Sequence, residues 1–301
     1  MREKIVKSKH FVPSCYSLFF VIVFLVSFYL TFPVESFRQR IISEIETRTP
    51  FKADIKKVNI SPIFSLNIHN MKLYKAEKQL LNIDELKIRP SLFSLFFGTL
   101  NLPFKACVLG GETIGTLIYS KRTKHIERAE AKITSVKVEK ITPFIPANLG
   151  NKRLSMQGFL EGNFSIAFNP EPQGDFAFDI SKLGIKNLRV RGFLFPEFIN
   201  MESSFKGKIE NEVTKIEDLK LEGDGLDLVI VGTMPLLWKV KRGGVIDLGL
   251  KLQLTGPKFA VFKRVLAPYL VPQGNGILGG KIAGTFHNPR LVKDLNNPNT
   301  Q

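Results

Sequence analysis

The sequence predicts a mainly β protein, with a single N-terminal transmembrane helix followed by a curved antiparallel β-sheet domain and a few short helices. Three observations lead to this fold class. One stretch near the N-terminus is long, apolar and free of charge. Further along, apolar residues recur at every second position, which is the period of a strand with one buried face. The long crossover helices that parallel strands require are missing, so we expect antiparallel pairing.

The charge-free stretch runs from Phe11 to Phe32, and its 22 residues exceed the length that a helix needs to cross a bilayer. Basic residues precede it, which predicts a cytoplasmic N-terminus and a chain that continues on the other side of the membrane. No small-residue cleavage site closes the stretch, so we expect an uncleaved anchor rather than a signal peptide. The aromatic residues assigned to this membrane anchor are Tyr16, Phe20, Phe24, Phe28 and Phe32.

Directly after the anchor, apolar residues recur at spacings of three and four, which predicts a short helix that ends before Pro50. The residues of this apolar stripe are Val34, Phe37, Ile41 and Ile45. Two uses of the stripe remain open: it lies on the bilayer, or it seals the base of the β domain.

Strict alternation of apolar residues is clearest over 160–168, 226–230 and 248–254. We expect most glycines to lie between or at the ends of such strands, in turns and bulges. Three interruptions are predicted to be helical and to cover apolar surface at the ends of the sheet. They are residues 91–97, 136–141 and 257–266.

Two distant segments repeat one order of residues. Gly158-Phe-Leu-Glu-Gly162 aligns with Gly276-Ile-Leu-Gly-Gly280, and an Asn-Pro pair follows each. The repetition indicates stacked supersecondary units that share one sheet. We therefore divide the chain into a cytoplasmic tip with the anchor (1–33), a juxtamembrane helix with a first β unit (34–135), and a second β unit that contains the repeated Gly-x-Leu-x-Gly strands (136–301).

The net charge of +16 is compatible with anionic lipid heads, an acidic protein or nucleic acid as partners. We expect no nucleic-acid partner, because the basic residues are dispersed and the domain lies beyond the membrane. Cys107 is the only thiol outside the anchor, so no disulfide is expected there.

The sequence offers no constellation for catalysis, and we expect neither an enzyme nor a bound cofactor or metal. The four histidines are far apart, without a partner at metal-ligand spacing, and no Gly-x-Ser-x-Gly motif is present. Glu222, Asp224 and Asp227 surround two glycines, but the ligand alternation of a calcium loop is absent, so a polar turn is favoured.

The 26 phenylalanines have two interpretations. On alternating strands they fill a closed core. On a sheet that curls into an open trough, they line an apolar groove that holds acyl chains and needs no catalytic residue. The candidate groove residues are Leu160, Phe164, Ile166, Phe168, Leu226, Leu228 and Ile230.

The order of motifs resembles known families. The anchor, then Val58-Asn-Ile60, Asn70-Met-Lys-Leu73 and the segment 90–98, is similar to the start of AsmA-like proteins. The second half, with Leu219-Lys-Leu-Glu-Gly223 and the closing segment 280–289, resembles type II secretion system protein N (GspN). The resemblance covers residues 10–290, and its motifs are patterns of glycine and apolar residues rather than chemical signatures.

The resemblance implies a single-pass protein of the bacterial inner membrane with a periplasmic C-terminal domain. It implies an accessory or scaffold role in the type II protein secretion system, with other secretion subunits as partners. AsmA-like relatives are associated with lipid movement, so the alternative is a lipid-binding or lipid-transfer protein for outer-membrane biogenesis. No functional residue is carried over, because the shared pattern is structural.

Overall fold

The computed structural model describes residues 11–61, 65–75, 78–91, 94, 98–140, 154–190, 193–236, 244–285 and 288–293. The chain divides into two compact units, Met1–Pro90 and Ser91–Gln301. The predicted fold class is confirmed. Both units are built from antiparallel strands, the helices that follow the anchor are short, and one apolar helix lies near the N-terminus.

Helix α2 (Phe11–Thr31) is the one helix, within the described ranges, that is long and apolar enough to span a membrane. Its segment Pro13–Thr31 has a mean hydropathy of 2.0, and none of it is buried inside the protein. At 1.5 Å per residue the helix rises about 31 Å, close to the roughly 30 Å of a hydrocarbon core. These properties are consistent with a single-pass anchor.

In the first unit, helix α3 (Val34–Arg48) packs against three strands that pair in order. The strands are β1 (Lys52–Ile60), β2 (Leu66–Lys75) and β3 (Lys78–Ile88).

The apolar stripe of α3 contacts the buried side chains of these strands. Ile55, Val58, Ile68 and Met71 form the buried cluster, and each is at most 7% exposed. The helix residues packed against this cluster are Val34, Phe37, Ile41, Ile42 and Ile45. Of the two uses predicted for the stripe, the structure therefore shows the one in which it seals the β domain.

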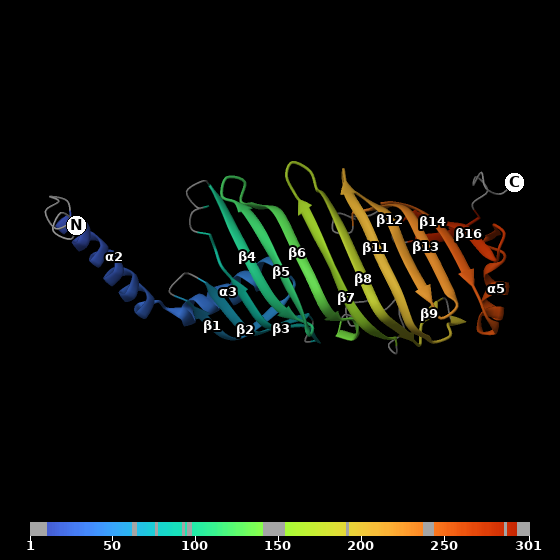
Figure 1. Cartoon of the computed structure of the whole chain (residues 1–301), viewed down its shortest axis with the longest axis horizontal. Helices are drawn as coiled ribbons and strands as arrows, with labels where there is room; N and C mark the ends of the chain where they lie inside the picture. The colour runs from blue at the N-terminus through green and yellow to red at the C-terminus, as the bar shows by residue number, and fades with distance from the viewer. Residues whose placement is uncertain are drawn as a thin grey trace, which may run out of the picture. The chain divides into compact units, whose positions relative to one another are not determined.

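In the second unit, ten strands each pair antiparallel with the next, and Figure 1 shows them side by side. They are β4 (Thr99–Val108), β5 (Gly111–Ser120), β6 (His125–Lys137), β7 (Ser155–Ala167), β8 (Gln173–Lys186), β11 (Phe198–Glu210), β12 (Val213–Gly223), β13 (Leu226–Pro235), β14 (Val245–Leu254) and β16 (Ile277–Thr285). Two shorter strands, β15 (Val271–Pro272) and β17 (Asn288–Val292), both pair with β16. A separate two-stranded ribbon contains β9 (Arg189–Val190) and β10 (Phe193–Leu194).

The helical predictions have different outcomes. The segment 257–266 is helical as predicted, with the 3-10 turn η3 (Pro257–Phe259) followed by α5 (Ala260–Leu266). The helix predicted over 136–141 is wrong at its start, because β6 continues to Lys137, where Val136 pairs with Leu160. A single 3-10 turn, η1 (Val138–Lys140), follows. Most of the segment 91–97 lies outside the described residues.

A line of β-bulges crosses four neighbouring strands, β6, β7, β8 and β11, where their registers shift. At these shifts the backbone is left-handed at Ser135, Gly158, Lys182 and Asn200, with φ of 54°, 138°, 52° and 56°. A bulge bends its strand and increases the local twist. The bulges lie within a few residues of one another from strand to strand, so all four strands bend in the same part of the sheet.

Candidate functional site

One side of the second sheet carries three continuous rows of apolar side chains and glycines, interrupted by one serine, which we call the apolar face. Cross-strand partners define each row from β7 to β16. The first row is Leu160, Ile180, Ser203, Leu221, Leu228, Leu252 and Leu278. The second is Gly162, Phe178, Phe205, Leu219, Ile230, Leu250 and Gly280. The third is Phe164, Phe176, Gly207, Ile216, Gly232, Leu248 and Ile282.

The structure places most of the candidate groove residues on this face. Leu160, Phe164 and Ile166 alternate along β7, and Leu226, Leu228 and Ile230 alternate along β13. Phe168 follows the last residue of β7, where its backbone N–H donates to the carbonyl of Glu127 at 2.8 Å.

Other residues of the face were not selected from the sequence. Phe176, Phe178 and Phe205 lie in the second and third rows, and their rings contact one another. The centroid of the Phe176 ring is 4.8 Å from that of Phe205 and 6.0 Å from that of Phe178. The alternation Phe176-Ala-Phe178-Asp-Ile180 is the signal that identifies this strand.

The two repeated Gly-x-Leu-x-Gly segments occupy equivalent places on the face. Leu160 and Leu278 are both in the first row, and Gly162 and Gly280 are both in the second. Each repeat therefore places its leucine in the first row and its second glycine in the second row.

One end of the apolar face is covered by η3, α5 and the residues up to Leu270, which we call the plug (Figure 1). Phe259 and Leu270 are each 1% exposed, and Phe262 is 9% exposed. These side chains form a buried cluster with Leu226 and Leu252 of the sheet. The cluster is packed against first-row residues and one residue of the second row: Leu160, Ile180, Leu221, Leu228, Leu278 and Leu250.

Much of the rest of the face is only half-buried, although Ile216 in the third row is 4% exposed. Phe164, Phe176, Phe205 and Leu248 do not belong to the buried cluster, and each keeps an intermediate exposure. Within the described part of the chain, the helical residues in the buried cluster come from the plug and from Val138 of η1, which follows β6 beside the first row.

Several phenylalanine rings lie directly over glycines of the neighbouring strand. A Cβ atom added at Gly162 would lie 2.5 Å from Cδ1 of Phe178, and one at Gly207 would lie 2.7 Å from Cζ of Phe176. The strand interior therefore requires glycine at these positions, in addition to the turn and bulge positions expected from the sequence. An aromatic ring that packs on a glycine lies flat against the sheet, so the ring does not project into the space above the strands.

The opposite side of the same strands is polar and carries ion pairs between neighbouring strands. Nζ of Lys208 lies 2.8 Å from Glu217, and Nζ of Lys281 lies 2.8 Å from Asp247. The hydrogen bond between Lys208 and Glu217 raises the pKa of the lysine and lowers the pKa of the glutamate. Such exposed pairs contribute little to stability, but they keep this side in water.

Of the acidic residues near Gly223, Asp224 lies in a two-residue turn between β12 and β13 and binds the plug, whereas Glu222 and Asp227 pair across the two strands. Asp224 has a left-handed backbone, and its carboxylate lies 2.5 Å from Nζ of Lys258 in η3 and accepts a 3.1 Å hydrogen bond from the N–H of Ile199. The hydrogen bond from Lys258 is the larger cause of the lowered pKa of Asp224, and the hydrogen bond from the Ile199 N–H is a smaller one. The structure thus bears out a polar turn, and the residues it describes contain no group suited to a metal ion.

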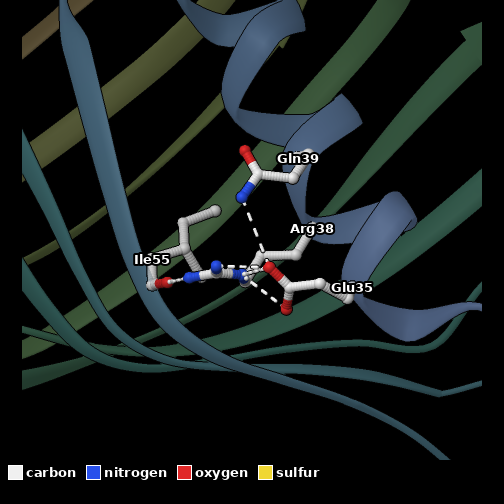
Figure 2. A network of polar contacts seen from close by, with 4 residues as sticks. All are labelled: Glu35, Arg38, Gln39 and Ile55. Atoms are coloured by element: carbon white, nitrogen blue, oxygen red, sulfur yellow. Dashed lines mark hydrogen bonds and ion pairs between the residues drawn. The ribbon is translucent and has the colours of Figure 1, made fainter.

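In the first unit, polar side chains of α3 bind the free edge of β1 (Figure 2). Nη1 of Arg38 donates to the carbonyl of Ile55 at 2.6 Å, and the backbone N–H of Ala53 donates to Glu46 at 3.2 Å. Arg38 also forms a bidentate pair with Glu35, to which Gln39 donates. This pairing raises the pKa of Arg38 and, with the bond from Gln39, lowers the pKa of Glu35.

The aromatic residues assigned to the anchor lie in α2 or directly after it. Tyr16 and Phe20 are 72% and 70% exposed, and Phe24 is also exposed. Phe28 lies in α2, but its side chain is outside the description. Phe32 follows the helix, and its ring packs edge-on against Phe37 with centroids 5.7 Å apart.

Comparisons with known protein families, with curated proteins and with solved structures found no match for this chain.

Proposed function

We propose that this chain is a membrane-anchored module that binds the acyl chains of lipids along the apolar face of its second unit. The observation that carries the proposal is the contrast within that face. All three rows continue from β7 to β16 and the plug covers the end nearest the first row, but Phe164, Phe176, Phe205 and Leu248 keep an intermediate exposure. The other side of the strands is polar, so the apolar side alone is suited to hydrocarbon.

The dimensions of the face suit a lipid tail. The strand order from β7 to β16 contains six inter-strand steps. At about 4.8 Å each, these steps span roughly 29 Å, close to the roughly 30 Å hydrocarbon core that two acyl chains form end to end. One row is therefore longer than a single acyl chain.

The energy of burial is sufficient to hold a tail. Each methylene removed from water contributes roughly 0.8 kcal/mol, so ten methylenes on the face contribute on the order of 8 kcal/mol. The binding requires contact with Phe164, Phe176, Phe205 and Leu248 but no catalytic group.

The anchor supports the same proposal, because α2 would keep the face close to a source of lipid. From the basic residues before α2, we infer a periplasmic location for the β units, in a bacterial inner-membrane protein that serves the outer membrane.

Photochemical cross-linking of the full-length protein tests the proposal. The chain is reconstituted in liposomes whose phospholipids carry a diazirine on the acyl chain, and adducts are mapped by mass spectrometry. We expect adducts on α2, which report the membrane, and a second group on β7, β8 and β11. Adducts confined to α2 would contradict acyl-chain binding.

A matched pair of variants makes this test specific. Phe164→Asp places a charge on the apolar face, whereas Asn163→Asp places the same charge one residue away on the opposite side of β7. We expect Phe164→Asp to remove the adducts on the sheet and Asn163→Asp to leave them unchanged. The adducts on α2 are the internal control in both variants.

An accessory role in type II secretion rests on the sequence resemblance alone and stays a prediction. It predicts that deletion traps secreted proteins in the periplasm while the lipid asymmetry of the outer membrane stays normal. Acyl-chain binding in the service of the outer membrane predicts the reverse. Adjacent genes for a secretin, a secretion ATPase and pseudopilins would favour the secretion role.

A further inference from the structure

The outer surface of the plug combines exposed apolar and basic side chains. Phe262 points into the buried cluster, but Val261 beside it is 65% exposed, and Tyr269 is 48% exposed. Lys263 and Arg264 are exposed in the last turn of α5. A surface of this kind is unusual for a short helix whose only task is to cover a sheet end.

Segments packed against the plug add further exposed apolar side chains. Leu194 is 53% exposed and precedes Phe195, whose ring centroid is 4.4 Å from that of Phe262. Ile199 is 58% exposed and follows Phe198, whose ring lies 5.9 Å from that of Phe259. Large apolar residues from three segments are therefore exposed at this end of the second unit.

The outer surface of the plug itself carries positive charge, whereas the exposed carboxylates Glu202, Glu222 and Asp227 form a cross-strand row on the polar side of the sheet. Asp224 is engaged by Lys258 at 2.5 Å, and Glu197 is engaged by Lys186 at 3.5 Å. Across the described ranges, no acidic side chain forms an ion pair with Lys263 or Arg264.

We propose that the plug end of the second unit docks on the surface of an anionic phospholipid membrane. Lys263 and Arg264 bind the headgroups, while Val261 and Tyr269 enter the boundary between headgroups and acyl chains. Interfacial segments join these two kinds of contact: basic residues are attracted to anionic lipid, and the buried apolar area strengthens the attachment. The proposal does not rest on acyl-chain binding, because it concerns the outer surface of the plug and not the apolar face.

A tethering experiment with the full chain tests the docking. The protein is held by its own anchor in nanodiscs of phosphatidylcholine, and labelled vesicles of a second membrane are added. We expect vesicles of phosphatidylcholine mixed with phosphatidylglycerol to capture the nanodiscs in a flotation assay, and vesicles of phosphatidylcholine alone to capture far fewer. Equal capture by both kinds of vesicle would overturn the proposal.

Charge reversal at the plug is compared with a matched reversal elsewhere. The double variant Lys263→Glu/Arg264→Glu is expected to weaken capture about tenfold or more, because each cation near an anionic surface contributes several-fold to the affinity. The control Lys206→Glu/Lys251→Glu changes the net charge equally, at exposed positions of β11 and β14. If the control loses capture to the same extent, the net charge and not the plug is responsible, and the proposal is wrong.

The apolar half of the contact needs its own variant. Val261→Ser/Tyr269→Ser keeps every charge and replaces side chains that are exposed, so the fold is expected to persist, as circular dichroism would verify. We expect it to weaken capture severalfold. Unchanged capture, or capture only by vesicles bearing an acidic protein, would contradict docking on lipid. Diazirine adducts on β7, β8 and β11 should persist in all plug variants, which separates this proposal from the proposed function.

Discussion

In the first unit a helix lies over the apolar side of the strands, whereas in the second unit the helical residues that the structure describes cover that side at one end. The side chains beneath α3, such as Ile55 and Ile68, are at most 3% exposed. Their counterparts in the rows beyond the plug, such as Phe164 and Ile230, are only half-buried. Both units show apolar residues at alternating positions, so alternation determines which side of a sheet is apolar but does not determine what covers it.

The two units are expected to differ most in the stability that is lost when Ile55 of the first unit or Ile230 of the second is replaced by alanine. Ile55→Ala leaves a cavity under α3 and is expected to lower the opening free energy of β1 and β2 by about 3 kcal/mol. Ile230→Ala removes a half-exposed side chain and is expected to cost about 1 kcal/mol in β12 and β13. Hydrogen exchange of the full chain, read strand by strand, measures both. Equal losses would show that the face of the second unit is as well covered as that of the first.

A glycine pair tests how the phenylalanine rings pack on the open rows. Gly207→Ala forces a Cβ to within 2.7 Å of Phe176 and 2.5 Å of the carbonyl of Lys215, and it is expected to cost about 2 kcal/mol. At Gly249 of β14 the nearest atom would be 3.7 Å away. Gly249→Ala is therefore expected to be neutral or to stabilise by about 0.5 kcal/mol. Thermal unfolding followed by circular dichroism distinguishes the two, and a neutral Gly207→Ala would mean that the ring does not rest on the glycine.

A polar contact between α3 and β1 also stabilises the packing of the helix in the first unit. Arg38→Ala removes the donor to the carbonyl of Ile55, so the local stability of β1 at this edge is expected to fall. Exchange of the amides of β1 is expected to accelerate accordingly. Arg40→Ala changes an exposed arginine of the same helix and is the matched control. A similar acceleration in both variants would assign the effect to charge rather than to the hydrogen bond.

The smallest expected effect is a pH dependence at the plug. The pKa of Asp224 is lowered in the folded protein, so its contribution is present above the ordinary aspartate pKa of about 3.9 and is lost as the pH falls through the lower folded value. Because the pair is partly exposed, we expect less than about 1 kcal/mol. Asp224→Asn should flatten this part of the acid profile in exchange measured over η3 and α5. A profile unchanged by the substitution would show that Asp224 does not hold the plug.

Much of the fold follows from the sequence, because its causes are local. The length and apolarity of 11–32 predict α2, and the spacing of Val34, Phe37, Ile41 and Ile45 predicts α3 and its contact side. The helical spacing over 257–266 likewise predicts the position of the plug.

The line of bulges was not predictable in this way. Ser135 and Lys182 adopt a left-handed backbone that their residue types disfavour, and neighbouring strands stabilise it. Each bulge also shifts the alternation by one position, so the pattern seen over 176–180 does not continue past Lys182 in β8.

The candidate site was predictable in its chemistry but not in its openness. The alternation in β7 and β13 identifies Phe164 and Ile230 as apolar-face residues. Whether a plug covers all of the rows or only the first depends on contacts between Phe259, Phe262 and the distant Leu226, and no local pattern encodes them.

The contacts of Arg38 and Glu46 have a consequence for how copies of this protein behave beside one another. They occupy a carbonyl and an N–H on the side of β1 that pairs with no strand among the described residues, where another polypeptide would otherwise align and form hydrogen bonds. A second molecule extends the sheet at this border only by displacing both side chains. Neighbouring molecules are therefore less prone to aggregate by extending the sheet at this edge, even though their strands are long and rich in valine, isoleucine and phenylalanine.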